Sequence, residues 1–259
     1  MEDQNLYDKL RELQAEGNHK INILQESVDI TLQMAYYRMA TNIKKDLDSK
    51  RDYLLEINKL YDPEIETSDK KKLLCTIASI EKPEYFRALE QFKTLAPQEL
   101  KDWTTLAIQE SKMLLESSLL ETKLLYISTG LGGKGSALRF FLVIIGKENK
   151  SFTESQIELL EKELEFQFNQ NSGEIEEIKF DHQYAQVLCL LPLETNIGDI
   201  VKKIIKECNT YGNFIEENFL LTNVKKLELD EIAEFFAKDK SKNEPKIDKQ
   251  DTSLNEGGE

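Results

Sequence analysis

Apolar residues recur every three or four positions through the first sixty or so residues of the chain. This spacing places them on one face of an α-helix, and neither proline nor glycine interrupts the stretch from about 19 to 60. The pattern predicts one long helix, or two with a subtle break, after a first helix over 3–16 that ends at Gly17. A core-facing stripe is favoured over a seam that pairs with another helix. The apolar positions are Ile21, Leu24, Val28, Leu32, Ala35, Met39, Ile43, Leu47, Leu54, Ile57 and Tyr61.

Three shorter helices are predicted to follow, over about 69–80, 83–95 and 97–120. Pro83 and Pro97 each fit the first turn of a helix, where the missing N–H costs nothing. The connections are only a few residues long, so neighbouring helices should pack antiparallel. Stacked helix pairs of this kind are similar to HEAT-type repeats in outline, although no repeating sequence signature accompanies them.

The pattern changes at about Leu124, where extended segments begin to alternate with helices. The segment LRFFLVIIG is apolar on both faces, which is typical of a central strand, whereas EIEEIKF is polar, as an edge strand should be. Thr153 and Gln156 have the spacing of a capping box at the start of a helix. The predicted strands are 138–146, 174–180, 184–192 and 219–227, and the predicted helices are 154–170, 197–208 and 229–237.

The resulting order of strand, helix, strand, strand, helix, strand is that of the ferredoxin-like βαββαβ fold with a four-stranded antiparallel sheet. Its two most apolar strands, the first and third, belong at the centre of that sheet. The sequence therefore predicts an α+β protein with an all-helical domain over 1–123, a glycine-rich junction over 124–137 and a ferredoxin-like domain over 138–237. The tail over 238–259 is too polar to offset the entropy of ordering and is expected to be disordered.

Charge and targeting patterns limit the classes of partner. The chain has 259 residues and a formal net charge of −14, which argues against a protein whose whole surface binds nucleic acid or acidic lipid. The N-terminus lacks the basic and apolar regions of a signal peptide. No apolar run approaches the ~20 residues that a membrane span requires. A cytoplasmic location without a membrane partner is therefore expected.

The cysteines and histidines give little support to a metal site. Cys75, Cys189 and Cys208 are far apart in the sequence and lie in apolar stretches, so they are interpreted as buried, reduced thiols. His19 and His182 are the only histidines, too few for a typical zinc site without closely spaced cysteines. No metal or other cofactor is expected.

The segment ISTGLGGKGSALR, residues 127–139, combines four glycines with basic residues and hydroxyls. No acidic residue occurs between Glu121 and Glu148, which is unusual in so acidic a chain. Glycines let successive backbone N–H groups point toward one site, and such a nest binds phosphate or carboxylate. The candidate ligand-binding residues are Ser128, Thr129, Gly130, Gly132, Gly133, Lys134, Gly135, Ser136 and Arg139.

This glycine segment matches neither of two familiar phosphate-binding motifs. A Walker A loop is excluded because Gly133-Lys134 is followed by Gly135 rather than by serine or threonine, and a Rossmann fingerprint is excluded because a strand follows the loop. The alternative interpretation is a hinge or a hairpin turn between the two halves, with basic residues that only improve solubility. The sequence leaves both interpretations open.

No catalytic constellation is found, and Asp181-His182 fits a hairpin turn. We therefore expect a non-enzymatic regulatory or scaffold protein that binds another protein through its helical half and could form a homodimer. One alternative is an RNA- or ribosome-associated factor that uses the glycine segment, or stacks bases on Phe140, Phe141 and Tyr184 of the sheet. Another is a protein that binds a nucleotide or other phosphate ligand. The acidic net charge disfavours nucleic acid.

Overall fold

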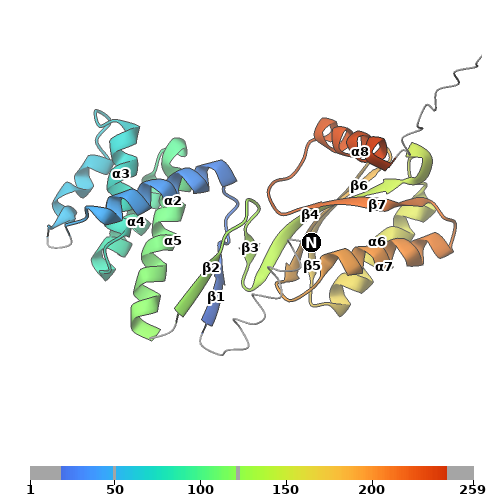
Figure 1. Cartoon of the computed structure of the whole chain (residues 1–259), viewed down its shortest axis with the longest axis horizontal. Coiled ribbons are helices and arrows are strands. Elements are labelled where there is room, and N and C mark those ends of the chain that lie inside the picture. The colour runs from blue at the N-terminus through green and yellow to red at the C-terminus, as the bar shows by residue number, and fades with distance from the viewer. Residues whose placement is uncertain (1–18, 49–50, 121–122, 244–259) are drawn as a thin grey trace, which may run out of the picture. The chain divides into compact units, whose positions relative to one another are not determined.

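The computed structural model describes residues 19–48, 51–120 and 123–243. It contains both helices and an antiparallel sheet, which confirms the α+β class (Figure 1). None of the described helices is both long enough and apolar enough to cross a lipid bilayer. The helix expected over 3–16 and most of the tail expected to be disordered lie outside the described residues.

The chain divides into two compact units, Met1–Lys226 and Leu227–Glu259. The second unit contains helix α8 (Leu229–Asn243), which confirms the short helix predicted at its start. The helix nevertheless continues into the segment predicted to be disordered. Lysines are good helix formers, and an ion pair between Lys238 and Glu234, 2.7 Å long and one turn apart, favours this extension.

The helical part of the first unit encloses a hydrophobic cluster of its own. The three shorter helices predicted from the sequence are confirmed to within a few residues. The helical elements are α2 (Ile30–Lys45), the 3₁₀ helix η1 (Tyr53–Leu60), α3 (Thr67–Ala78), α4 (Pro83–Leu95) and α5 (Gln98–Leu120). Fully buried members of the cluster include Tyr36, Leu74, Ile77, Leu89, Leu100 and Leu106.

The long helix predicted over 19–60 is wrong. Its first part is strand β1 (His19–Ile23), which pairs in parallel with β2 (Lys123–Ile127) on the far side of the helical part in sequence. Helix α2 begins only at Ile30, because the carboxylate of Asp29 accepts hydrogen bonds from two N–H groups of the first turn, at 2.9 and 3.1 Å. The three-to-four-residue spacing continued by coincidence through a strand, a capped helix start and a 3₁₀ turn.

The second half of the first unit is an antiparallel sheet with the strand order β5-β6-β4-β7. Its first and third strands in sequence are therefore central and its second and fourth lie at the edges, as expected from their polarity. Helices α6 (Glu154–Gln170) and α7 (Ile197–Thr210) cover one face (Figure 1). The strands are β4 (Ala137–Gly146), β5 (Glu174–Asp181), β6 (Tyr184–Pro192) and β7 (Ile215–Thr222), with a short β3 (Gly133–Lys134) paired to the start of β4.

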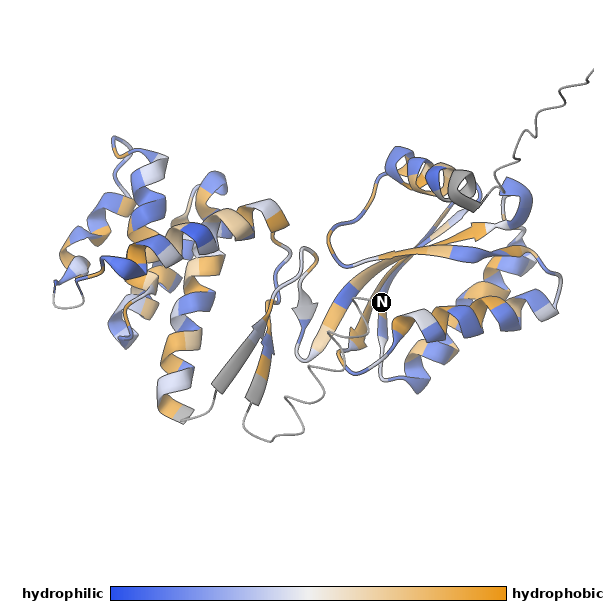
Figure 2. Cartoon of the chain, in the orientation of Figure 1, coloured by the Kyte–Doolittle hydropathy of each residue, from blue (hydrophilic) through white to orange (hydrophobic). Residues whose placement is uncertain are grey.

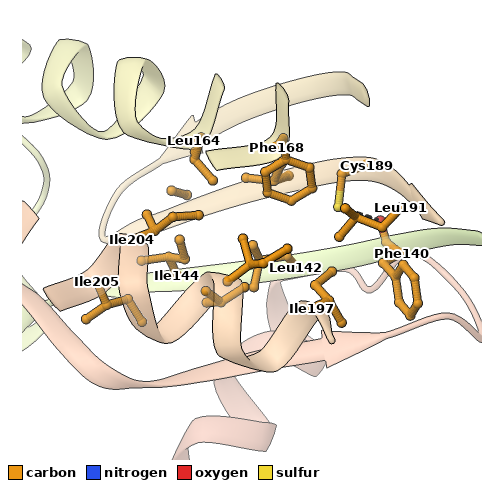
Figure 3. Close-up of a cluster of buried hydrophobic side chains, with 14 of the residues drawn as sticks. Phe140, Leu142, Ile144, Leu164, Phe168, Cys189, Leu191, Ile197, Ile204 and Ile205 are labelled. Carbon is orange, nitrogen blue, oxygen red and sulfur yellow. Dashed lines mark hydrogen bonds between the residues drawn. The ribbon is translucent and has the colours of Figure 1, made fainter. Parts of the chain in front are cut away.

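Alternate residues of the two central strands form the core beneath these helices (Figure 3). The hydropathy colouring shows hydrophobic residues concentrated in the strands, whereas the helices carry both hydrophobic and hydrophilic residues (Figure 2). Cys75, Cys189 and Cys208 are buried and free, as predicted. Core residues include Phe140, Leu142 and Ile144 from β4, Val187 and Leu191 from β6, Leu164 and Phe168 from α6, and Ile197, Ile204 and Ile205 from α7.

The last strand of the sheet is displaced from its predicted position of 219–227. It begins at Ile215 and ends at Thr222, so it includes three polar residues, EEN over 216–218, that interrupt the apolar pattern. Its pairing with β4 contains an irregularity between Ile144 and Gly146. An edge strand exposes much of its surface and therefore needs few apolar residues, which is why hydrophobicity alone misplaced it.

Candidate functional site

Two glycines of the glycine segment lie against backbone that is distant in sequence. A Cβ atom on Gly130 would lie 1.8 Å from the carbonyl oxygen of Val224, and one on Gly132 would lie 2.4 Å from that of Glu26. Gly132 also has a φ of +68°, a region that glycine occupies more readily than other residues. These positions require glycine because a side chain would separate packed chain segments.

The middle of the segment forms a β-hairpin. Lys134 pairs with Ala137, so Gly135 and Ser136 form a two-residue turn. Gly135 has a φ of +61°, and nothing lies within 4 Å of a Cβ atom built on it. The hairpin alternative considered from the sequence therefore describes this part of the segment.

Backbone N–H groups in the segment donate to acceptors within the protein. The N–H of Leu131 donates to the carbonyl of Asn223 at 3.0 Å. Gly133 donates to the backbone carbonyl of Gln25 at 3.3 Å, and Gly135 donates to the side-chain oxygen of the same glutamine at 2.7 Å. An anion bound to these groups would have to displace those acceptors.

The two basic side chains of the segment are paired with acids of strand β5. The ammonium of Lys134 contacts both carboxylate oxygens of Glu174, at 2.9 and 2.7 Å. The guanidinium of Arg139 binds Glu176 through two nitrogens, at 2.5 and 2.8 Å, and donates to the carbonyl of Leu131 at 2.8 Å. These ion pairs neutralise the local positive charge that the sequence indicated.

The pairing with Arg139 predicts a pH-dependent contribution to stability. The hydrogen bond from Arg139 lowers the pKa of Glu176 below its ordinary value of 4.5. Because the folded-state pKa is depressed, the pair stabilises the fold above about pH 4.5. That contribution is lost as the pH falls through the lower pKa of the folded protein. We expect Glu176→Gln to lower the free energy of unfolding by about 1 kcal/mol at pH 7 and by much less near pH 3, measured by urea unfolding.

The more exposed pair provides the control for this prediction. Glu174→Gln removes a carboxylate whose side chain is 55% exposed, against 23% for Glu176, so its effect at pH 7 should be the smaller one. A loss in Glu176→Gln that stays constant between the two pH values would show that the ion pair is not its cause.

Ser128 and Thr129 lie on a different side of the segment, toward α2. The hydroxyl of Ser128 donates to the side-chain oxygen of Gln33, whose amide nitrogen donates to the carbonyl of Thr129 at 3.1 Å. Ser136 is exposed in the turn. The predicted ligand-binding residues thus contact α2, the loop after β1 and the acids of β5 separately, and ligand binding by the glycine segment stays a prediction.

The hairpin turn predicted at Asp181-His182 is confirmed. Asp181 pairs with Tyr184 across the turn, and His182 has a φ of +52°. Its Nδ1 atom lies 2.6 Å from a carboxylate oxygen of Asp181. Among the described residues, no group of three or more His, Cys, Asp or Glu side chains is placed to hold a metal ion.

A groove of about 620 Å³, lined mostly by residues with polar side chains, lies beside α7 and β7 and was not identified from the sequence. Lys202 and Lys206 line it one helical turn apart, and both are exposed. Within the described part of the chain, neither lysine has an acidic partner within ion-pair distance. Glu217 of β7 is the acidic residue that lines the same groove.

Two asparagines support the end of this groove. Asn209 holds the start of β7 by accepting a hydrogen bond from the N–H of Ile215 at 2.9 Å and donating to its carbonyl at 2.8 Å. Asn213, which also lines the groove, accepts a hydrogen bond from the ammonium of Lys147 at 2.9 Å. The groove thus contains amide groups and cations in a fixed backbone frame.

An exposed aromatic residue lies at the end of the same helix, five residues after Lys206. Tyr211, at the C-terminal end of α7, is 76% exposed. The aromatics considered as stacking platforms from the sequence are not available for that role, because Phe140, Phe141 and Tyr184 are buried at 5%, 3% and 7% exposure. Two lysines four residues apart on the polar face of α7 were the signal that could have identified the groove.

Comparison with known proteins gives similarity to solved structures only. No protein-family model matches the chain, and no curated protein matches it. One similar structure is a protein described as a candidate transposase from Deinococcus radiodurans R1, at 15% identity and a TM-score of 0.35, covering 41% of this chain and 93% of the other. Another is a REP-associated tyrosine transposase bound to a REP hairpin, at 11% identity and a TM-score of 0.30, covering 38% of this chain and 61% of the other.

These comparisons overturn one expectation from the sequence. Both similar structures are described as transposases rather than as regulatory or scaffold proteins. The expectation of a non-enzymatic regulatory or scaffold protein that binds another protein through its helical half is therefore wrong. Similarity at TM-scores of 0.35 and 0.30 does not assign a function to this chain.

Proposed function

We propose that this protein binds single-stranded nucleic acid in the groove beside α7. The observation that carries the proposal is the pair of exposed lysines, Lys202 and Lys206, which lie one turn apart in the groove on the helix that ends at the exposed Tyr211. Non-specific binding of single strands combines cationic side chains that track the phosphates with aromatic rings on which bases stack. The groove supplies the cationic side chains, and the exposed ring of Tyr211 lies at the C-terminal end of the same helix.

The charge of the groove differs from that of the chain as a whole. A net charge of −14 repels a polyanion, so binding has to depend on local contacts and should be strongest at low salt. Elsewhere on the sheet, Lys134, Arg139 and Lys226 are each paired with a glutamate of β5. Lysines without such partners retain their charge for phosphate.

The exposed tyrosine favours a single strand over a duplex. A base can stack on Tyr211 only when it is not already stacked within a double helix. Stacking of one base on an aromatic ring contributes about 1–3 kcal/mol. Tyr211→Ser should therefore weaken binding to a single strand and leave any weak binding to a duplex unchanged.

Fluorescence anisotropy with a labelled single-stranded DNA tests the proposal. A length of about 20 nucleotides is sufficient, because one single-strand binding site of this kind covers about 4–16 nucleotides. We expect Lys202→Gln/Lys206→Gln to weaken binding by at least about fivefold at low salt. For this double variant, the slope of log affinity against log salt concentration should be shallower by about 1.4 than for the unaltered protein. Each phosphate contact on a single strand contributes about 0.7 to that slope, and two contacts are lost. Glu217→Gln, which removes the acidic residue of the groove, should tighten binding.

The control removes the same amount of charge elsewhere. Lys112→Gln/Lys162→Gln takes away two lysines that are exposed and lie near glutamates of their own helices. Equal losses in the two double variants, or no salt-sensitive binding by the unaltered protein, would refute the proposal. Repeating the titration with the same sequence as RNA and as a DNA duplex shows which nucleic acid the protein binds most tightly.

We also propose that residues 138–237 form a ferredoxin-like domain and residues 1–123 a helical domain. The support for this division is the strand order with the first and third strands at the centre, together with two hydrophobic clusters. One cluster comes from the helical part, and the other comes from the sheet with α6 and α7 and also includes Ile23 of β1. HEAT-like packing of the helices, a cytoplasmic location and a partner protein or second copy stay predictions. Binding of a single strand at α7 requires none of them.

A further inference from the structure

A cavity of about 490 Å³ lies in the helical part, between α2, α5 and the end of β2. Ile30, Met34 and Met113 supply apolar walls, and the rings of Tyr37 and Tyr126 line it as well. A volume of 300–1,000 Å³ with mostly apolar walls and a few polar groups is typical of small-molecule sites. This cavity is separate from the groove beside α7.

A buried carboxylate with a partly exposed lysine lies at one side of the cavity. Glu110 is only 5% exposed, and one of its oxygens accepts from the phenol of Tyr36 while the other lies 2.5 Å from the ammonium of Lys44 and 3.3 Å from the hydroxyl of Ser79. Both carboxylate oxygens are therefore occupied. Burying a charged group so completely requires such partners.

Lys44 has donors that this network does not use. An ammonium group carries three N–H donors, and the contact with Glu110 occupies one of them. The side chain of Lys44 is 43% exposed and lines the cavity, whereas that of Glu110 is 4% exposed. The accessible charge of the pair is therefore positive.

The two tyrosines keep their hydroxyl protons at neutral pH. Burial raises the pKa of Tyr37, and burial together with the nearby charge of Glu116 raises the pKa of Tyr126 to about 12. Each tyrosine therefore has a hydroxyl that can act as a hydrogen-bond donor and a ring that can contact an apolar group. Ser128, the glycine-segment residue bound to Gln33, also lines this space.

We propose that this cavity binds a small organic anion, with its anionic group on Lys44 and a flat apolar body between Tyr37, Met34 and Met113. An anion is favoured because both carboxylate oxygens of Glu110 already have partners, whereas the ammonium of Lys44 has donors that are not used. The anionic fluorophore 8-anilinonaphthalene-1-sulfonate has this chemistry and emits strongly in apolar sites. Its uncharged relative N-phenyl-1-naphthylamine and the cationic dye thioflavin T provide the comparison.

Fluorescence titration of the full chain with the three dyes tests the inference. We expect the anionic dye to bind at least about tenfold more tightly than the cationic one, as one charge-assisted hydrogen bond supplies. The double variant Lys44→Met/Glu110→Gln removes both charges of the pair, so that no carboxylate is left unpaired in the interior. It should lose about tenfold in affinity for the anionic dye and retain binding of the uncharged dye.

Two further variants keep the result interpretable. Lys45→Met removes a neighbouring exposed lysine whose ammonium donates to the side-chain oxygen of Asn42 at 3.4 Å, and should not change binding of any dye. Thr41→Trp places a large ring at an exposed position that lines the cavity, and should block both the anionic and the uncharged dye. Tighter binding of thioflavin T, or unchanged binding of the anionic dye in Thr41→Trp, would overturn the inference.

Discussion

Replacing Leu142 with alanine is expected to lower the free energy of unfolding by about 3 kcal/mol. Leu142 lies in the middle of β4, is fully buried and belongs to the cluster between the sheet and helices α6 and α7 (Figure 3). The loss combines the transfer energy of the removed methyl groups with the cavity that they leave. It should appear as a lower midpoint in urea unfolding followed by circular dichroism.

The same substitution at an exposed leucine is the control. Leu119, near the end of α5, is 80% exposed, so Leu119→Ala removes the same atoms without leaving an internal cavity. We expect its effect to stay within about 0.5 kcal/mol. If the two variants unfolded at the same urea concentration, Leu142 would not lie in the core and the sheet would be incorrectly assigned.

The second half of the fold was predictable because its signals are local and agree with one another. Strand 184–192 was predicted with its observed bounds, since an apolar run bounded by a turn and a proline has few alternatives. Helix α7 was equally clear from its apolar spacing. The strand order then follows from polarity, because the polar strand β5 belongs at an edge.

The first half was less predictable because its errors depend on long-range pairing. Strand β1 is stabilised by β2, which lies beyond the whole set of helices in sequence, and nothing within His19–Ile23 indicates that partner. The apolar spacing around it fits a helix equally well. A five-residue strand is too short for its own periodicity to decide.

The glycine segment shows the same limit for a candidate site. Its basic character is evident from the sequence, but the acids that neutralise it, Glu174 and Glu176, lie on the far side of α6 in the chain. Only the pairing of β5 next to β6, and of β6 next to β4, brings them near Lys134 and Arg139. A local run of positive charge is therefore weaker evidence for an anion site than a pair of lysines without partners.

Two substitutions at similar backbone conformations can separate the two reasons for glycine in this segment, which are backbone strain and close packing. Gly132 and Gly135 have φ values of +68° and +61°, so alanine suffers comparable conformational strain at both. Their surroundings differ, because a Cβ atom on Gly132 would lie 2.4 Å from the carbonyl oxygen of Glu26, whereas one on Gly135 meets nothing within 4 Å. Backbone strain and close packing can therefore be measured independently.

We expect Gly135→Ala to lower the free energy of unfolding by about 1 kcal/mol, which is the penalty of a left-handed conformation for alanine. Gly132→Ala should lower it by about 3 kcal/mol or more, because the strain is joined by overpacking against a backbone that cannot rotate away. Urea unfolding of both variants measures the difference. A large difference means that the segment is a fixed packing element, since a freely moving hinge would accommodate one methyl group at either position with the same small loss.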